Sequence, residues 1–122
     1  MTYTEIVEML TSTEIPFTYY SWPEKEAPQL PYICYYYPSS DNEPADNKVH
    51  KRIENLTIEL YTDYKDFALE EALQDILDEN SIVWERDEEY ITNEHMFMIT
   101  YSAQVAIDHT VVEEEAEITE ES

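Results

Sequence analysis

Glycine is absent from this chain of 122 residues, although average usage predicts about eight. Phosphate-binding loops, dinucleotide-binding turns, nucleophile elbows and EF-hand loops all need glycine, because their backbones turn sharply or approach a ligand closely. The sequence therefore argues against the common nucleotide-dependent enzymes. Backbone positions with a positive φ angle must then be occupied by asparagine or aspartate, which tolerate this conformation better than other non-glycine residues. The candidates are Asn47, Asn55, Asn80 and Asn93.

Cysteine occurs once, at Cys34, so no intramolecular disulfide is expected. Because Cys34 lies in an apolar run, we interpret it as a small buried hydrophobic residue rather than a nucleophile. The sequence shows no secretory signal pattern, and no apolar run approaches the length of about 18 residues that crosses a membrane. We therefore expect no membrane association, and a protein of the cytoplasm or of a particle assembled there.

Basic residues are scarce, with six lysines and arginines against 29 aspartates and glutamates, giving a formal charge of −23. Their one local cluster contains Lys48, Lys51 and Arg52, which is too little to neutralise a row of phosphates or dock on an anionic membrane. This cluster is either a patch for an acidic neighbour or a local charge balance. The acidic residues either increase solubility or give the protein an electronegative surface along which DNA moves without binding.

Hydrophobic periodicity predicts two helices. The first follows a cap at Thr2 or Thr4, ends before Pro16 and buries one face. That face contains Ile6, Val7, Met9 and Leu10. The second helix runs from a cap at Asp63 or Asp66 to Asn80, which takes the left-handed stop. Its core-facing stripe contains Leu69, Ala72, Leu73, Ile76 and Leu77, and its outer residues include Glu70, Glu71, Gln74, Asp75 and Asp78.

The remaining pattern predicts strands over residues 17–22, 32–37, 49–60, 82–84 and 96–106, with a long loop at 38–47. The middle strand changes phase near Asn55, which predicts a β-bulge there. The fold class is therefore α+β, with two helices packed on a largely antiparallel, curved sheet in the order α-β-β-β-α-β-β. Because 43% of the residues are hydrophobic, residues 1–112 can form one domain. The last ten residues, 113–122, hold six glutamates, so we expect them to form a disordered acidic tail.

No catalytic, metal-binding or cofactor-binding constellation is visible, so we expect a protein that is not an enzyme and has no cofactor. The histidines His50, His95 and His109 lack the close spacing of metal ligands. The successive tyrosines are more informative, because Tyr35, Tyr36 and Tyr37 must point to both faces of a strand. Tyrosine is enriched at interfaces. Structural packing explains each ring alone, and an oligomer contact is the alternative.

A family resemblance covers roughly residues 30–105. The segment ADNKVHKRIENLTIELYTDYKDFALEEALQDILDENSIVWE resembles the tail-completion proteins of long-tailed bacteriophages, the tail-terminator or head-tail joining family. It carries an Ala-Asp-Asn-Lys start, an Ile-Glu-Leu-Tyr-Thr strand end and a Lys-Asp helix start, at residues 45–48, 58–62 and 65–66. The absent glycine and the acidic tail depart from the family pattern.

The resemblance implies a structural virion protein, a homo-hexameric ring that closes the head-proximal end of the tail. Its partners are the tail tube protein and a head-tail connector protein, and DNA passes without specific binding. The expected contact residues are Trp22, Tyr35, Tyr36, Tyr37, Asp46, Asn47, Lys48, Lys51 and Arg52. The alternative function is an acidic DNA mimic that inhibits a nucleic-acid-binding host defence protein. A mimic is a monomer or dimer with its carboxylates along one face, whereas a terminator forms ring contacts.

Overall fold

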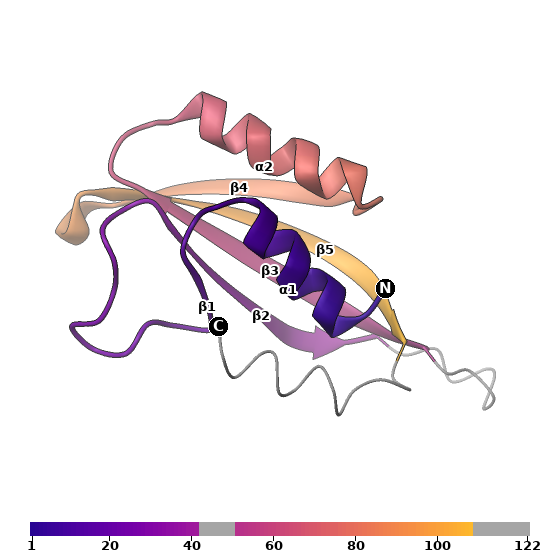
Figure 1. Ribbon diagram of the computed structural model, residues 1–122. Helices are drawn as coiled ribbons and strands as arrows, with labels where there is room; N and C mark the ends of the chain where they lie inside the picture. The colour runs from indigo at the N-terminus through magenta and orange to yellow at the C-terminus, as the bar shows by residue number, and fades with distance from the viewer. Residues whose placement is uncertain (42–50, 109–122) are drawn as a thin grey trace.

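The computed structural model describes residues 1–41 and 51–108, apart from the Lys51 side chain, and contains two α-helices and five strands there (Figure 1). In chain order the elements are α1 (Tyr3–Ser12), β1 (Phe17–Tyr19), β2 (Tyr32–Ser40), β3 (Lys51–Thr62), α2 (Phe67–Glu79), β4 (Trp84–Ile91), the 3-10 helix η1 (Thr92–Glu94) and β5 (Met96–Asp108). The α+β class is confirmed. The predicted acidic tail lies outside the described residues.

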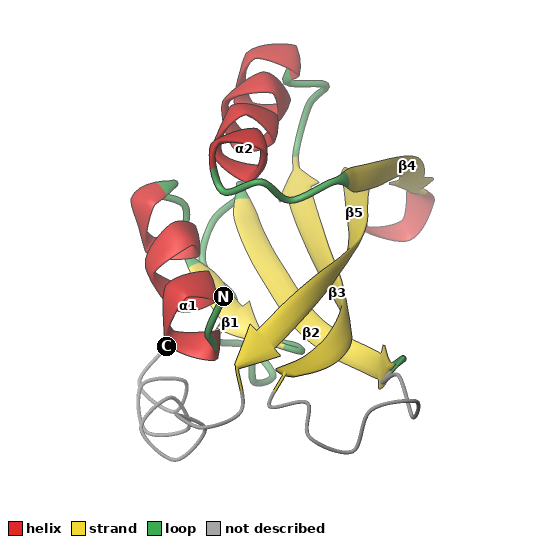
Figure 2. Cartoon of the chain, turned by 90° about the vertical axis from the view of Figure 1, so that its right-hand side faces the viewer, coloured by secondary structure: helices red, strands yellow, loops and turns green. Residues whose placement is uncertain are grey.

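The strands form one mixed sheet in the order β1-β2-β3-β5-β4 (Figure 2). The pairs β2–β3, β3–β5 and β4–β5 are antiparallel, as predicted. The exception is β1, which runs parallel to β2 and places Phe17 opposite Ile33. Because a tight turn cannot join parallel neighbours, residues 20–31 form a long connection between the two strands.

Both helices begin at predicted side-chain caps. Thr2 Oγ1 accepts a hydrogen bond from the Glu5 backbone N–H at 3.1 Å, and Glu5 Oε1 accepts one from the Thr2 N–H at 2.8 Å. This reciprocal pair is a capping box. Asp66 Oδ1 accepts a hydrogen bond from the Leu69 N–H at 3.0 Å and caps α2. The helix starts were therefore readable from the sequence.

The hydrophobic core lies between the sheet and the two helices, which cover the same side of the sheet (Figure 2). Alternate residues of the two central strands are buried, as their period-2 patterns predict. The core contains Ile6, Val7, Met9, Leu10, Ile33, Tyr35, Leu56, Ile58, Leu60, Leu73, Leu77, Ile99, Tyr101, Val105 and Ile107, among others. We call this side of the sheet the helix face and the opposite side the outer face.

The β-bulge that the sequence predicts in β3 lies instead in β2. Pairing between β3 and β5 shows no register shift. Between β2 and β3 the register shifts from Tyr36 opposite Thr57 to Ser39 opposite Asn55, so β2 carries one extra residue there. Pro38 lies in this bulge, where its missing N–H disturbs the ladder least. Strand β2 therefore continues to Ser40 through the start of the predicted loop, and residues 42–50 lie outside the described part.

Strand β3 keeps one phase along its length, contrary to the predicted phase change. Glu54 consequently faces the core, where it is 9% exposed, and the half-buried Ile53 points to the outer face. The buried carboxylate has two hydroxyl donors. Tyr3 donates its hydroxyl hydrogen to Glu54 Oε2, and Ser40 Oγ donates to Glu54 Oε1 at 2.5 Å. The prediction failed because it placed the apolar Ile53, rather than a glutamate, on the inner face.

Asparagine does not occupy the positive-φ positions of the described chain. These positions are Glu14, Tyr20, Lys25, Ser81 and His95. Asn80 keeps a negative φ of −94°, so the predicted left-handed stop of α2 is wrong at that residue. The next residue, Ser81, takes φ 61°, and its N–H donates to the Asp78 carbonyl at 3.0 Å. The left-handed conformation costs about 1 to 2 kcal/mol, which hydrogen bonds at a helix end offset.

Two further side-chain predictions around α2 are wrong. Glu70, predicted on the outer side of the helix, is 3% exposed, whereas Ala72 of the predicted core stripe is exposed.

The strand predicted at 82–84 begins at Trp84 and continues through the charged residues to Ile91. Val83, just before it, is 86% exposed.

Candidate assembly surfaces

The outer face of the sheet carries no α-helix within the described residues (Figure 2). At one end, residues that follow β1 cover it. Tyr20 packs against Tyr36 with ring centroids 5.1 Å apart, and Trp22 packs against Tyr32 at 5.9 Å. Cys34 also points to this side and is 5% exposed. Burial raises the pKa of the Cys34 thiol to about 11, so the thiol stays protonated at neutral pH.

One carboxylate on the outer face is held between two tyrosines. The hydroxyl of Tyr36 donates to Glu59 Oε2 at 2.8 Å, and the hydroxyl of Tyr61 donates to Glu59 Oε1 at 2.7 Å. Burial, followed by the hydrogen bond to Glu59, raises the pKa of Tyr36 to about 12. The same two causes raise the pKa of Tyr61. Both tyrosines are therefore neutral donors, and we call Tyr20, Tyr36, Glu59 and Tyr61 the aromatic cluster.

The other end of the outer face is polar. Asn55 Nδ2 donates to Ser39 Oγ at 2.7 Å and to Asp41 Oδ2 at 3.0 Å. Gln104 Nε2 donates to the same Asp41 oxygen at 3.0 Å and to Asn55 Oδ1 at 3.2 Å. Asn55 and Gln104 line a surface hollow together with Pro38 and Val83. The network holds the bulged part of β2 against β3 and β5, so it shapes this end of the face.

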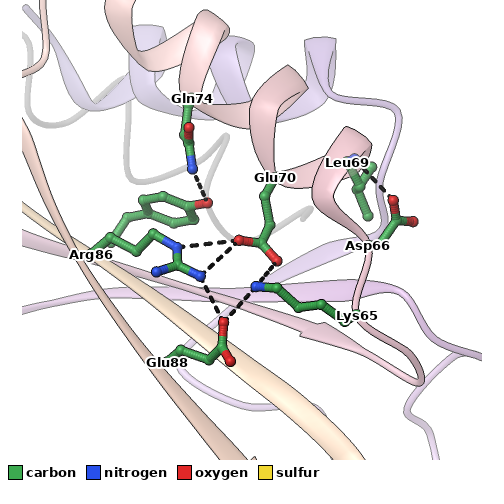
Figure 3. Close-up of polar contacts among 8 residues, drawn as sticks. Lys65, Asp66, Leu69, Glu70, Gln74, Arg86 and Glu88 are labelled. Atoms are coloured by element: carbon green, nitrogen blue, oxygen red, sulfur yellow. Dashed lines mark hydrogen bonds and ion pairs between the residues drawn. The ribbon is translucent and has the colours of Figure 1, made fainter.

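An ion cluster on the helix face joins α2 to the edge strand β4 (Figure 3). Lys65 Nζ lies 2.5 Å from Glu70 Oε2 and 2.5 Å from Glu88 Oε1. Arg86 Nη2 lies 3.1 Å from Glu70 Oε1 and 2.7 Å from Glu88 Oε1. The cluster of Lys65, Glu70, Arg86 and Glu88 has two positive and two negative charges, so its formal charges cancel.

The pKa values in the ion cluster follow its geometry. The hydrogen bond from Lys65 is the first cause that lowers the pKa of Glu88. Burial lowers the pKa of Lys65, but hydrogen bonds to the two glutamates outweigh it and the pKa is raised overall. Lys65, Arg86 and Glu88 therefore stay charged at neutral pH. Gln74 Nε2 adds a hydrogen bond to the Tyr101 hydroxyl at 3.0 Å, which fastens α2 to β5 as well.

Three acidic side chains of β4 form a row on the outer face. Glu85, Asp87 and Glu89 alternate with the cluster residues Arg86 and Glu88, and all three are exposed. None of the three forms an ion pair or side-chain hydrogen bond with any residue in 1–41 or 51–108. We call Glu85, Asp87 and Glu89 the edge row.

The predicted tyrosine contacts divide between core and surface. Tyr35 is 1% exposed in the core, so its assignment as a surface contact is wrong. Tyr37 is half-buried on the helix face, and its ring lies 5.3 Å from that of Tyr3. Tyr36 and Trp22 are half-buried on the outer face. Tyr35, Tyr36 and Tyr37 alternate between the two faces of β2, as predicted, but the helices cover the ring of Tyr35.

The predicted basic contact region is described only in part. Arg52 is exposed near the start of β3, opposite Ile107. Lys51 pairs through its backbone with Asp108, and its side chain lies outside the described part. Asp46, Asn47 and Lys48 also lie outside it. The structure therefore brings the predicted aromatic contacts to the sheet, and of the predicted basic side chains it describes that of Arg52.

Among residues 1–41 and 51–108, no three histidine, cysteine, aspartate or glutamate side chains come together as a metal site. No helix in these ranges is long and apolar enough to cross a membrane. His95 is exposed at the turn between η1 and β5.

The class that these features define is an α+β domain whose sheet has one helix-covered face and one face without helices. No protein-family model matches the chain, and no curated protein matches it significantly.

Proposed function

We propose that this chain is a structural virion protein, the tail terminator or head-tail joining ring that closes the head-proximal end of a phage tail. The proposal rests on the resemblance of roughly residues 30–105 to that family. The structural observation that carries it is the outer face of the sheet, which the two helices leave uncovered. A ring subunit needs a surface that is left for its neighbours, while its hydrophobic core is completed on the opposite face of the sheet.

The aromatic cluster is the part of the outer face best suited to a subunit contact. Tyr20 is 66% exposed and lies against Tyr36, which the Glu59 hydrogen bond holds in place. Large aromatic side chains with fixed orientations are typical of the residues that dominate binding energy at interfaces. Tyr20 was not among the contacts predicted from the sequence, because nothing in the local pattern shows that it packs beside Tyr36.

The charge distribution suits a channel for DNA. The chain carries a formal charge of −23, and two of its cations, Lys65 and Arg86, are already paired within the ion cluster. A ring of such subunits repels the phosphate backbone, so that the duplex passes without being held. The proposed partners are the tail tube protein on one side and a connector protein on the other, in a homo-hexamer.

The oligomeric state and the binding of tail tubes test this proposal directly. We expect native mass spectrometry to detect a closed ring, alone or after addition of purified tail tubes, and electron microscopy to show it at one tube end. Tyr20→Ser should weaken ring formation, whereas Tyr64→Ser should not. Tyr64 is a matched control because it is 62% exposed and follows β3 outside the aromatic cluster.

Removal of the gene from its phage provides the functional test. Overlong or headless tails beside filled heads would support the proposal. Normal infectious particles in its absence would rule out a role in joining the tail to the head.

A DNA-mimicking inhibitor is the second candidate, and the edge row favours it. Alternate residues of a strand lie about 6.6 Å apart, so Glu85, Asp87 and Glu89 present negative charges at regular intervals along one face. A mimic predicts a monomer or dimer that competes with duplex DNA for a host protein. The mass measurement described above separates the two functions, because a mimic should form no ring on tail tubes.

A further inference from the structure

Strand β4 is an open edge of the sheet. It pairs only with β5, and no other segment of residues 1–41 or 51–108 pairs with its free side. Every residue from Glu85 to Tyr90 is exposed. Every second residue of such a strand directs its N–H and C=O groups away from the sheet, where they can pair with another chain. At eight residues, β4 is long enough to accept a full strand.

The two sides of this edge differ in chemistry. The outer side carries the unpaired edge row Glu85, Asp87 and Glu89. On the helix side, the charges of Arg86 and Glu88 are neutralised within the ion cluster. Aromatic rings flank them there, with Trp84 half-buried and Tyr90 47% exposed. An added strand would therefore meet three negative charges on one side and, on the other, the charge-balanced pair Arg86 and Glu88 between two aromatic rings.

The ion cluster also fixes the edge in place. Lys65 and Arg86 each bind one carboxylate of α2 and one of β4, as Figure 3 shows. A binding surface that is already ordered loses less conformational freedom when a partner arrives. The edge is thus prepared for binding before any partner is present.

A second copy of β4 does not fit this edge. Antiparallel pairing of two β4 strands places Glu85 of one copy near Glu89 of the other, and Asp87 near Asp87. Like charges directly opposite each other in a sheet are destabilising, so the edge row blocks this self-pairing. The same charges attract a strand with basic residues at alternate positions.

We propose that the β4 edge is a docking site for an extended basic segment of a different protein, which adds to the sheet as a sixth, neighbouring strand. Backbone hydrogen bonds supply the pairing, and side chains at alternate positions supply the specificity. The segment has lysine or arginine at every second residue, facing the edge row. Its intervening residues are apolar and face Trp84 and Tyr90. This site is separate from the aromatic cluster and stands whether or not the chain forms a ring.

A synthetic peptide as long as β4, in which lysine alternates with valine and threonine, tests the site on the full chain. We expect the peptide to shift the backbone amide resonances of β4 and to bind more weakly as salt increases. The double variant Glu85→Lys, Glu89→Lys should lower its affinity about tenfold or more, since two attractive pairs become repulsive. The matched control Glu71→Lys, Asp75→Lys reverses two exposed charges on α2 and should change the affinity about twofold at most.

Several outcomes would overturn the proposal. An equal loss of affinity in both double variants would mean that the peptide senses only net charge. A peptide with N-methylated backbone amides that binds equally well would exclude strand addition. A change of oligomeric state in the Glu85→Lys, Glu89→Lys variant would assign the edge to a second copy of this chain. Circular dichroism of each variant, compared with the original chain, checks that the fold is retained in these measurements.

Discussion

Glu70 on α2 and Glu88 on β4 share the same two cationic partners, because Lys65 and Arg86 each bind both carboxylates (Figure 3). The two glutamates differ in burial, with side chains 4% and 36% exposed, respectively. A buried carboxylate is tolerated only when its charge is balanced and its oxygens are hydrogen-bonded. Glu70 meets both conditions, and the pairing determines where α2 lies over the edge of the sheet.

Replacement of this buried carboxylate should destabilise the fold. We expect Glu70→Gln to lower the free energy of unfolding by about 2 kcal/mol, because two cations lose their buried partner while Glu88 still balances them in part. Urea denaturation followed by tryptophan fluorescence measures this change. Glu71→Gln is the control, since the neighbouring residue is exposed and its replacement should cost under about 0.5 kcal/mol. Equal costs would show that the ion cluster does not stabilise the fold.

The acid dependence of stability should contain a contribution from Glu88. Its hydrogen bond from Lys65 lowers its pKa in the folded chain below the ordinary value of 4.5, so at acidic pH the unfolded chain binds more protons. The stabilisation is therefore present above pH 4.5 and is lost as the pH falls through the lower folded pKa. We expect the difference in unfolding free energy between the original chain and Glu88→Gln to shrink over this range. A difference that stays constant with pH would contradict this assignment.

The helices and the central strands were predictable because their patterns depend on local chemistry. Thr2 and Asp66 cap the helices through side chains three positions from the amides they bind. The alternation of Ile99, Tyr101 and Val105 follows from burial of one face of β5. These features need no knowledge of distant contacts.

The errors arise where a distant partner decides the conformation. Glu70 is buried because Arg86, sixteen positions along the chain, reaches it from β4. Glu54 faces the core because Tyr3 and Ser40 supply hydroxyl donors there. A hydrophobicity pattern assigns both glutamates to the surface, since it contains no information about these donors. The parallel pairing of β1 with β2 was missed for the same reason, because the two strands pair only after residues 20–31 bring the chain back.

The adjacent residues Tyr35 and Tyr36 should respond differently to truncation. Tyr35→Ala empties a position in the core and should cost about 4 kcal/mol of stability. Tyr36→Phe retains the ring and removes only the hydrogen bond to Glu59, so it should cost about 1 kcal/mol. Equilibrium denaturation of both variants measures the two costs. Similar small costs for both would contradict the placement of Tyr35 in the core.

Tyr3 and Glu54 provide a test of the buried hydrogen bond between α1 and β3. Tyr3→Phe removes the donor, and Glu54→Gln removes the charge of the acceptor while keeping its shape. We expect each single variant to lose about 1 to 2 kcal/mol of unfolding free energy, because a hydrogen bond to a buried charged group is stronger than one between neutral groups. The double variant should lose clearly less than the sum, since both changes remove the same interaction. Ser40→Ala in place of Tyr3→Phe repeats the cycle for the second donor. Strictly additive losses would mean that the carboxylate is held by groups other than these hydroxyls.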